Sequence, residues 1–533
     1  MSDQPTITPA SLEQQVATRR TFAIISHPDA GKTTLTEKLL LYGNAIHLAG
    51  SVRARRNQRN TRSDWMKIER ERGISITSTV LQFPYRGYTV NLLDTPGHAD
   101  FSEDTYRTLA ATDSAVMVLD AAKGVEPQTR KLFDVCRQRG IPVFTFINKM
   151  DRPARDPLSL LDEIETVLGM QPVPITWPID DGPGFKGVYH RLTGHVHLYE
   201  RTAHNQTAAH EQSFPVDAPE LKDYLTPANF EALETSLELL DGLGITFDHE
   251  LVLAGQQTPV YFGSALINFG VQIFLDSFID FAPPPASYTA DTGPVDPTTD
   301  DFSGFVFKIQ ANMNPRHRDS VAFLRICSGR FERNMVVNHP RTGRTIRLPR
   351  PYAFFAEERS VIEEAYPGDI IGLPNSGNYA IGDTLVAGKK FNFAPIPRFQ
   401  PEHFAALRNP DIGKQKNFIK GLQQLQTEGA MQIFFYADGR RDPILGVVGI
   451  LQFDVVQARL ADEYGVETTL DTLPYQLARW VTGDTEQIED LPWGHGLLRT
   501  RDDHDRLVAL FRSQHDLNYC IERYPKVTFS ATG

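Results

Sequence analysis

Apolar runs alternate with amphipathic stretches along the first half of the chain. Between residues 20 and 282, apolar runs of strand length are separated by stretches in which apolar residues recur at helical spacing. This alternation is typical of a parallel α/β sheet. Residues 170–258 interrupt it with mixed polar sequence, which we interpret as an insertion before the last strand. The predicted strands are Thr21–Ile25, Thr89–Leu93, Ala115–Asp120, Val143–Ile147 and Pro259–Phe262, and the predicted helices include Thr34–Tyr42, Gln128–Arg139 and Pro157–Leu168.

The pattern changes after residue 282. Pro283–Asp301 contains five prolines and little to bury, and so it is predicted to be a linker. Short β-rich runs then favour a small antiparallel β-barrel over residues 302–390. From residue 391 to 533, strand-like and helical runs mix, as where Gly446–Leu451 is followed by Gln452–Tyr464, which predicts an α+β domain. No internal repeat is evident. The predicted barrel strands include Phe302–Gln310, Val321–Ser328, Val361–Glu364 and Ile370–Leu373.

Length and composition fit this three-domain division. A chain of 533 residues exceeds one core at about 100–200 residues per domain. The three cysteines, Cys136, Cys327 and Cys520, show no paired or metal-binding spacing, which favours a reduced, cytoplasmic setting. No run of 18 apolar residues and no apolar leader occurs, so neither a membrane partner nor secretion is expected. We expect a monomer.

The charge balance limits the partners. A net charge of −12 argues against free nucleic acid binding over the whole surface. Two local clusters remain, with five arginines in Arg53–Arg62 and four in Arg341–Arg350. Each cluster is either a solvated loop or a local contact for a phosphate backbone.

A phosphate-loop motif lies between the first predicted strand and helix. Ser26 stands where GxxxxGK[ST] usually has its first glycine. Backbone N–H groups of such a loop bind phosphates, Lys32 adds a charge at the β- and γ-phosphates, and the Thr33 hydroxyl reaches Mg²⁺. The alternative is that Gly31-Lys32 only begins a helix and binds no ligand. The predicted strand before the loop and the predicted helix after it disfavour this alternative. The predicted phosphate-binding residues are Ser26, His27, Pro28, Asp29, Ala30, Gly31, Lys32, Thr33 and Thr34.

A second motif ends the next predicted strand. Asp94 is placed to hold the Mg²⁺ shell, and Gly97 can offer its amide to the γ-phosphate because no Cβ blocks the approach. Alone, such a sequence would often be only a turn. The predicted nucleotide-site residues here are Asp94, Thr95, Pro96, Gly97 and His98.

The third motif, Asn148-Lys149-Met150-Asp151, predicts guanine selectivity. Asp151 can accept two hydrogen bonds from the N1–H and N2–H₂ edge of guanine, whereas adenine would leave the carboxylate unpaired at a cost of about 1–3 kcal/mol or more. Lys149 can cover the base with its aliphatic stem. Ser264 and Ala265 follow the last predicted strand and fit a backbone donor to the guanine O6. All these segments follow the carboxyl ends of strands, where open α/β sheets bind ligands.

These motifs have the forms found together in the translational GTPases of the elongation factor G/Tu family, which the chain resembles more than it does the wider Ras-like class. The resemblance implies that His98 replaces the glutamine that orients the attacking water in Ras-like proteins. It also implies a switch loop whose hydroxyl joins Mg²⁺ in the GTP state. Ser75 stands where most of the family has threonine, and Thr77 is the competing candidate. The segments that carry the resemblance are His27–Lys32, Glu71–Ile76 and Asp94–His98.

Within that family the chain is most similar to the branch that acts in translation termination. The tail favours α+β where elongation factor Tu has a second barrel, and the chain ends too soon for the further domains of elongation factor G. Gly446–Arg459 and Phe453–Val466 resemble the third domain of elongation factor G. The match spans about residues 18–530. The segments that carry it are Ser63–Met66, Phe101–Arg107, Asp120–Glu126 and Ile175–Ile179.

This resemblance implies a ribosome-stimulated GTPase with GTP/GDP and Mg²⁺ as its ligands. The implied partners are the ribosome, through rRNA and proteins at the factor-binding site, and the class I peptide release factors, whose dissociation after peptide release it would promote. The alternatives are another ribosomal GTPase, such as a translocase-like or ribosome-protection factor, and a GTP-regulated scaffold without significant hydrolysis. The Asn148–Asp151 motif disfavours an ATP-dependent kinase.

Overall fold

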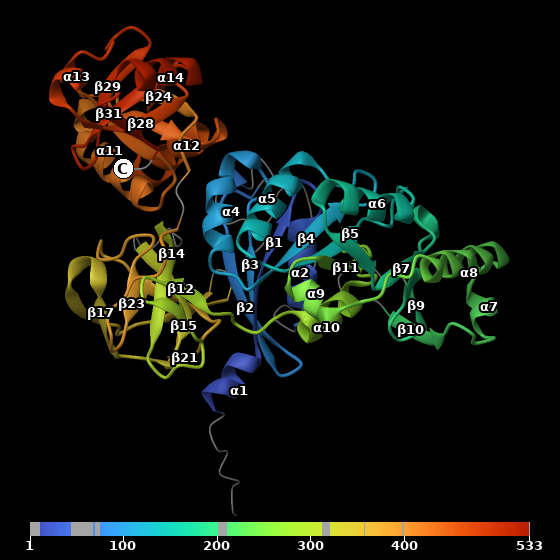
Figure 1. Cartoon of the computed structure of the whole chain (residues 1–533). Helices are drawn as coiled ribbons and strands as arrows, with labels where there is room; N and C mark the ends of the chain where they lie inside the picture. The colour runs from blue at the N-terminus through green and yellow to red at the C-terminus, as the bar shows by residue number, and fades with distance from the viewer. Residues whose placement is uncertain are drawn as a thin grey trace, which may run out of the picture.

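The computed structural model describes residues 11–43, 68–69, 75–200, 210–311, 320–355, 358–396 and 399–531. Figure 1 shows three bodies: an α/β domain in blue to green, a β domain in yellow, and a C-terminal α+β domain in orange to red. This arrangement confirms the fold class predicted from the sequence. Three predicted features lie wholly or mostly outside the described residues. They are the arginine cluster at 53–62, the segment Ser63–Met66 and the switch residues 71–74.

The α/β domain is built on a sheet with the strand order β2-β3-β1-β4-β5-β11-β6. β2 is antiparallel to β3, and the other neighbours are parallel. Strands β1, β4, β5 and β11 are buried along their whole length, which explains their nearly continuous apolar sequences. All five predicted strands are confirmed, with small differences at their ends. The strands are β1 (Arg19–Ser26), β2 (Thr79–Tyr85), β3 (Tyr88–Asp94), β4 (Ser114–Asp120), β5 (Val143–Asn148), β6 (Gln171–Pro174) and β11 (Gln257–Phe262).

One helix of this domain, α6, has capping signals at both ends. In α6, the Asp156 carboxylate accepts from the Ser159 N–H at 2.9 Å, Pro157 occupies the first turn, and Gly169 ends the helix at a φ of 65°. These signals fix the helix at the bounds that its amphipathic pattern predicted. The helical elements are α1 (Leu12–Ala17), α2 (Lys32–Tyr42), η2 (Ala99–Phe101), α4 (Ser102–Leu109), α5 (Pro127–Gln138), α6 (Pro157–Leu168) and α10 (Val271–Phe281).

The polar stretch between α6 and β11 folds in two parts. Its first strand, β6, joins the main sheet beside β11. Most of the remainder forms a separate four-stranded antiparallel sheet with two helices, at the side of the domain away from the β domain (Figure 1), whereas the short helix His249–Leu253 packs against β11. These elements are β7 (Thr176–Ile179), η3 (Gly182–Gly184), β8 (Gly187–His190), β9 (His195–Glu200), β10 (His210–Pro215), α7 (Leu221–Tyr224), α8 (Pro227–Gly242) and α9 (His249–Leu253).

The proline-rich connection is more ordered than its composition suggests. It contains a short hairpin of β12 (Tyr288–Ala290) and β13 (Gly293–Val295). Ala290 is buried, and the Tyr288 ring lies 5.3 Å from that of Phe305 in the β domain. The connection therefore packs against the domains that it joins.

The β domain contains an antiparallel sheet around β14 and β15. The predicted run Val361–Glu364 is not one strand, because β20 ends at Val361 and pairs with β19, whereas β21 begins at Glu364 and pairs with β16. Its strands are β14 (Ser303–Ala311), β15 (Ser320–Ser328), β16 (Phe331–Glu332), β17 (Val336–His339), β18 (Arg344–Arg347), β19 (Tyr352–Phe355), β20 (Glu358–Val361), β21 (Glu364–Ala365), β22 (Ile370–Pro374) and β23 (Thr384–Val386).

Buried ion pairs join the α/β and β domains. The Arg325 guanidinium donates to the Asp113 carboxylate at 2.6 Å, and neither side chain is more than 1% exposed. Arg19 makes a second such contact with Asp369 at 2.9 Å. Removing one partner of a buried pair leaves an uncompensated charge, at a cost of about 3–5 kcal/mol. These contacts therefore fix the two domains against each other.

The C-terminal domain repeats one topology twice. Each half follows the order β-α-β-β-α-β, and the two four-stranded sheets join into one through β25 and β29. No sign of this repeat is visible in the sequence. The first half is β24 (His403–Arg408), α11 (Gln415–Thr427), β25 (Gln432–Tyr436), β26 (Ile444–Val447), α12 (Leu451–Tyr464) and β27 (Thr469–Leu473). The second half is β28 (Leu477–Gly483), α13 (Thr485–Glu489), β29 (Leu497–Asp502), β30 (Leu507–Phe511), α14 (Gln514–Arg523) and β31 (Val527–Ser530).

Within the described residues, every helix is too short or too polar to cross a membrane.

Candidate nucleotide site

The predicted phosphate loop connects β1 to α2. Asp29 and Gly31 have φ angles of 65° and 97°, so the backbone turns sharply just before the helix. A Cβ at Gly31 would lie 2.2 Å from the Asn148 amide nitrogen, which leaves room only for glycine. Among the described residues, no side chain caps the first turn of α2. These helix N–H groups, with the positive end of the helix dipole, suit an anion such as a phosphate.

Lys32 and the predicted Mg²⁺ ligand Asp94 lie close together. Lys32 begins α2, Asp94 ends β3, and the Lys32 ammonium lies 3.8 Å from the Asp94 carboxylate. Both side chains are almost fully buried, whereas Thr33 and Thr34 are half-buried. A buried cation beside a carboxylate and a threonine hydroxyl is the donor set that a magnesium–phosphate complex requires.

The loop after β3 is held close to the phosphate loop. The Thr95 hydroxyl donates to the Ile24 carbonyl of β1 at 2.6 Å. A Cβ at Gly97 would lie 3.4 Å from the backbone of Pro28, so the two loops are in near contact. This geometry fits the prediction that Gly97 approaches a bound phosphate.

His98 caps the short helix η2 that follows. Its Nδ1 accepts from the Asp100 N–H at 3.3 Å and lies at the same distance from the Asp100 carboxylate. The side chain is 34% exposed, and its ring lies 6.1 Å from that of Phe101. The imidazole therefore faces the start of α4, and its predicted role in orienting water stays a prediction.

The base-reading segments are brought together by side chains that bridge loops. The Asn148 amide donates to the Ala30 carbonyl of the phosphate loop and accepts from the Ala265 N–H, both at 2.9 Å. The Ser264 hydroxyl donates to the Asp151 carboxylate at 2.5 Å. The predicted residues from three separate segments thus share one pocket. The Ala265 N–H donates to Asn148 and the Ser264 N–H to the Phe269 carbonyl, and the predicted backbone donor to the guanine O6 stays a prediction.

Lys149 has a partner that the sequence analysis did not identify. Its ammonium donates to the Asp120 carboxylate at 2.7 Å, and its backbone adopts a φ of 73°. Burial alone would raise the pKa of Asp120, but hydrogen bonds from Lys149 and the Ala122 N–H hold that pKa below its usual value. Asp120 ends β4 in the same way that Asp94 ends β3, and that position was the signal available in the sequence.

The end of the predicted switch loop is held by buried groups. The Glu69 carboxylate accepts from the N–H groups of Ile76 and Thr77, at 2.9 and 3.1 Å, and lies 3.5 Å from the Thr77 hydroxyl. Ser75 is half-buried. Which of Ser75 and Thr77 joins Mg²⁺ stays open, and the predicted ligand role of Ser75 stays a prediction.

A buried lysine of the β domain reaches the same segment. The Lys308 ammonium donates to the carbonyl and, at 2.8 Å, to the hydroxyl of Ser78, and it lies 3.3 Å from the Asp104 carboxylate of α4. Thr108 also donates to the Ser78 hydroxyl. Burial lowers the pKa of Lys308, while Lys308 and Arg107 keep the pKa of the buried Asp104 below its usual value. Sequence reasoning missed this contact, because its members lie more than 200 residues apart.

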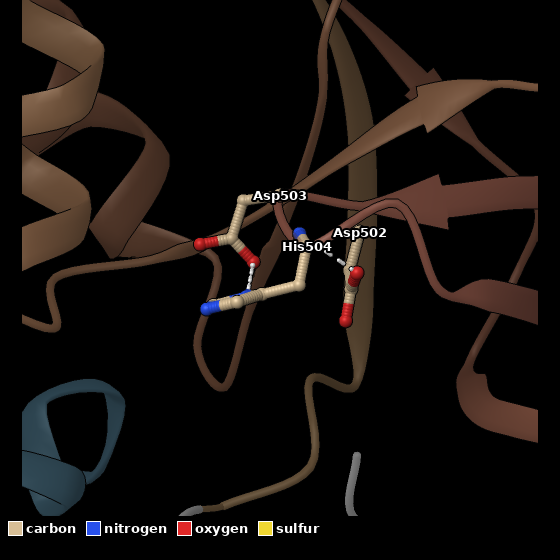
Figure 2. Close-up of side chains that lie close together, drawn as sticks. All are labelled: Asp502, Asp503 and His504. Atoms are coloured by element: carbon tan, nitrogen blue, oxygen red, sulfur yellow. Dashed lines mark hydrogen bonds and ion pairs between the residues drawn. The ribbon is translucent and has the colours of Figure 1, made fainter. Parts of the chain in front are cut away.

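A second cluster of potential metal ligands lies far from this pocket, in the β29–β30 turn. Asp502, Asp503 and His504 place their ligand atoms within 4.8 Å of one another (Figure 2). The Asp502 carboxylate, however, already accepts from the Trp480 indole and from the backbone and side chain of Arg506. These bonds explain the cluster as the internal structure of a turn.

Comparison with known proteins accounts for most of the chain. Residues 17–284 match the Elongation factor Tu GTP binding domain, residues 301–388 match Elongation factor G domain 2, and residues 393–521 match Class II release factor RF3, C-terminal domain. The chain is 24% identical to a protein from Thermus thermophilus of known crystal structure, over 92% of this chain and 72% of that one, with a TM-score of 0.69. That likeness shows a shared fold.

Curated relatives match over nearly the full length. Peptide chain release factor 3 of Gloeobacter violaceus is 57% identical over 521 residues, which is 97% of this chain and 98% of the relative. The protein of the same name from Microcystis aeruginosa is 57% identical over 514 residues, or 96% and 94% of the two chains. These matches confirm the predicted termination branch of the translational GTPases. The chain belongs to the peptide chain release factor 3 family and is a GTPase of translation termination.

Proposed function

We propose that this chain uses GTP binding and hydrolysis on the ribosome to promote dissociation of class I release factors after peptide release. One observation carries the proposal. The two loops beside the candidate γ-phosphate site are bonded directly to the other two domains, through Ser78 to Lys308 of the β domain and through Asp100 to the Leu451 N–H of the C-terminal domain. A change of nucleotide at these loops therefore changes the contacts that hold the domains together.

The phosphate side of the pocket has defined tasks. Backbone N–H groups of residues 26–33 and the Lys32 ammonium bind the phosphates, and Thr33, Asp94 and Ser75 hold Mg²⁺. Bound Mg²⁺ supplies neutralisation of the phosphate charge. Gly97 donates its N–H to the γ-phosphate, and His98 orients the attacking water. Phosphoryl transfer needs little further help, because it depends mainly on positioning and charge stabilisation.

The base side selects guanine. The Asp151 carboxylate accepts from the guanine N1–H and N2–H₂ groups, while Ser264 fixes its orientation through the 2.5 Å hydrogen bond. Lys149, held by Asp120, covers the base with its stem. Adenine would leave the Asp151 carboxylate without its partners in a closed pocket.

A basic strand of the β domain supports contact with ribosomal RNA. Arg344, Arg347 and Arg350 are exposed on or beside β18, and none forms an ion pair with any described residue. Arg341, the fourth member of the cluster, is occupied by Asp383. Exposed guanidinium groups on an acidic protein orient it toward a phosphate backbone, with an affinity that falls as salt rises. We expect the chain to act as a monomer.

A recycling assay tests the proposed function. Ribosomes that have released their peptide carry a fluorescent class I release factor, and its departure is followed after addition of this protein with GTP or GDP. We expect acceleration with GTP, and none when the Lys32→Ala variant replaces the protein. A translocation assay on the same ribosomes should show no activity. Unaccelerated departure with GTP would refute the termination role, and translocation would instead support a translocase-like factor.

A further inference from the structure

The C-terminal domain contacts the loop that carries His98 through the start of helix α12. Helix α12 begins at Leu451, and among the described residues no side chain of the helix itself caps its first turn. The cap comes from the α/β domain, where the Asp100 carboxylate accepts from the Leu451 N–H at 2.7 Å. In Figure 1, α12 lies on the side of its domain that faces α4. The residue two positions after His98 thus satisfies a helix terminus of another domain.

Gly449 allows this contact to be close. A Cβ at Gly449 would lie 2.3 Å from the Asp100 Cβ and 2.4 Å from its Cα. Its backbone φ is not in the left-handed region, so conformational freedom does not explain the glycine. The neighbouring atoms belong to the backbone and the first side-chain carbon, which cannot move aside alone. Any larger residue here would push the two domains apart.

Apolar and polar groups extend the same contact. Ile76 of the switch segment, Phe101 and Val455 of α12 belong to one buried cluster. Arg107 of α4 donates to the Gly429 carbonyl of the C-terminal domain at 3.3 Å. The docked domain therefore covers both loops that flank the candidate γ-phosphate site.

Asp100 connects this docking to the imidazole. One carboxylate oxygen bonds to the Leu451 N–H, the other lies 3.3 Å from His98 Nδ1, and the Asp100 N–H donates to the same nitrogen. The backbone between His98 and Asp100 forms one short helical turn, η2. A displacement of α12 thus removes a contact that fixes Asp100, and Asp100 in turn fixes the ring.

We infer that Asp100 is a positioning residue that holds the His98 ring as the cap of η2 while the C-terminal domain is docked. Displacement of α12, as when the ribosome moves that domain, releases Asp100 and lets His98 reach the attacking water. The docked form is therefore the slow form of the enzyme. The inference rests on the proposed role of His98 and adds the element that controls it.

The first test uses the steric limit at Gly449. Gly449→Ala should undock α12 and raise the ribosome-free kcat for GTP at least about fivefold, the lower end of typical coupling between sites, with KM for GTP unchanged. Gly242→Ala is the matched control, because its added methyl group would meet open space at an ordinary φ. Small-angle X-ray scattering reports whether the domain has moved. An undocked Gly449→Ala protein with unchanged kcat would overturn the inference.

A second pair of variants tests the inference if the C-terminal domain remains docked in the Gly449→Ala protein. Asp100→Ala removes the carboxylate that caps α12 and lies beside His98 Nδ1, while the backbone N–H of residue 100 remains, and so it should also raise the ribosome-free kcat. Asp100→Asn keeps an oxygen for the Leu451 N–H, and its kcat should stay within about twofold of the unaltered protein. Equal rates for all three proteins would overturn the inference.

A double variant separates this inference from the role of His98. In a His98→Ala background, Gly449→Ala should give no gain, since the released group is absent, whereas a general loosening of the fold would still change the rate. A persistent gain in kcat would show that Gly449→Ala does not act through His98, and it would overturn the inference. If His98→Ala alone left ribosome-stimulated turnover intact, the proposed role of His98 itself would fail. If His98 proved essential but undocking left kcat unchanged, only the inferred control of His98 by Asp100 and α12 would fail.

Discussion

The two sides of the nucleotide pocket are held in different ways. On the base side, Asn148 joins the phosphate loop to the loop after β11, and Ser264 fixes Asp151, so every contact lies within the α/β domain. On the γ-phosphate side, Ser78 is held by Lys308 of the β domain and Asp100 caps a helix of the C-terminal domain. The base side is complete in one domain, whereas the phosphate side depends on all three.

This difference explains how one pocket can bind a guanine nucleotide selectively and still respond to the presence of the γ-phosphate. A pre-formed base site gives selectivity without rearrangement, because its polar groups already face the right way. A phosphate site shared with other domains turns the presence of one phosphate into a change of domain contacts. Variants on the two sides should therefore fail differently, in binding on one side and in turnover or domain coupling on the other.

The largest effect is expected at the phosphate side. His98→Ala should lower ribosome-stimulated kcat by about 10²–10³-fold, because water would lose its orienting group, while nucleotide affinity stays within a few-fold. Single-turnover phosphate release on ribosomes, beside equilibrium nucleotide titration, measures both. The control is His504→Ala, an exposed histidine of the C-terminal domain. A large loss of GTP affinity instead would place His98 in binding and weaken the comparison.

The contact between the β domain and the switch segment comes next. Lys308→Met should lower the free energy of unfolding by about 3 kcal/mol, because Asp104 would lose its buried cationic partner. Denaturant unfolding measures the change, with the exposed Lys420→Met as control. Adding Asp104→Asn to Lys308→Met should recover part of the loss. No recovery would mean that Lys308 acts by packing rather than by charge.

On the base side, Asp151→Asn should weaken GTP binding by about 1–3 kcal/mol and shift preference toward xanthine nucleotides. The amide can donate to the 2-oxygen of xanthine, which a carboxylate cannot. Titration with GDP and xanthosine diphosphate measures the shift, and exposed Asp162→Asn on α6 is the control. Ribosome-stimulated kcat at saturating nucleotide should be retained. Unchanged selectivity would remove Asp151 from base reading.

The smallest effect is expected on the surface of the β domain. Arg344→Gln and Arg347→Gln should each reduce the slope of log affinity for ribosomes against log salt by about one, with a loss of a few-fold at physiological salt. Arg333→Gln is the matched control, since Arg333 is already paired with Glu363 at 2.7 Å. Equal slopes for all three variants would exclude β18 from the RNA contact.

Local signals predicted much of the α/β domain. The strands that carry the motifs are buried on both faces, so their apolar runs were visible, and the helical spacing of apolar residues predicted the bounds of α6. The pairing of Asn148 with Ala265 could be anticipated because both follow strands of one parallel sheet. The predicted site residues were thus brought together by a rule of topology rather than by local sequence.

What the sequence did not predict depends on distant partners. Lys308 resembles any lysine in a strand until the fold places Ser78 beside it, 230 residues away. Nothing in the sequence around Asp100 indicates that this residue contacts Leu451, 351 residues later. The repeated topology of the C-terminal domain was also hidden, because the two halves share the order of their elements without sharing a visible sequence pattern. The strand break near Val361 arises from a change of pairing partner.

The buried contact of Arg325 with Asp113 has a mechanical consequence. Separating the two groups would leave two unpaired charges in an apolar environment. The α/β and β domains should therefore move together as one rigid body during the GTPase cycle. Among the described residues, the contacts of the C-terminal domain with the α/β domain include a helix cap, a hydrogen bond to a carbonyl, the ring contact of Tyr106 with Phe399 and an apolar cluster, but no buried ion pair of this kind. The C-terminal domain is thus the part that can move relative to the other two, and GTP hydrolysis should act on its contacts with the α/β domain.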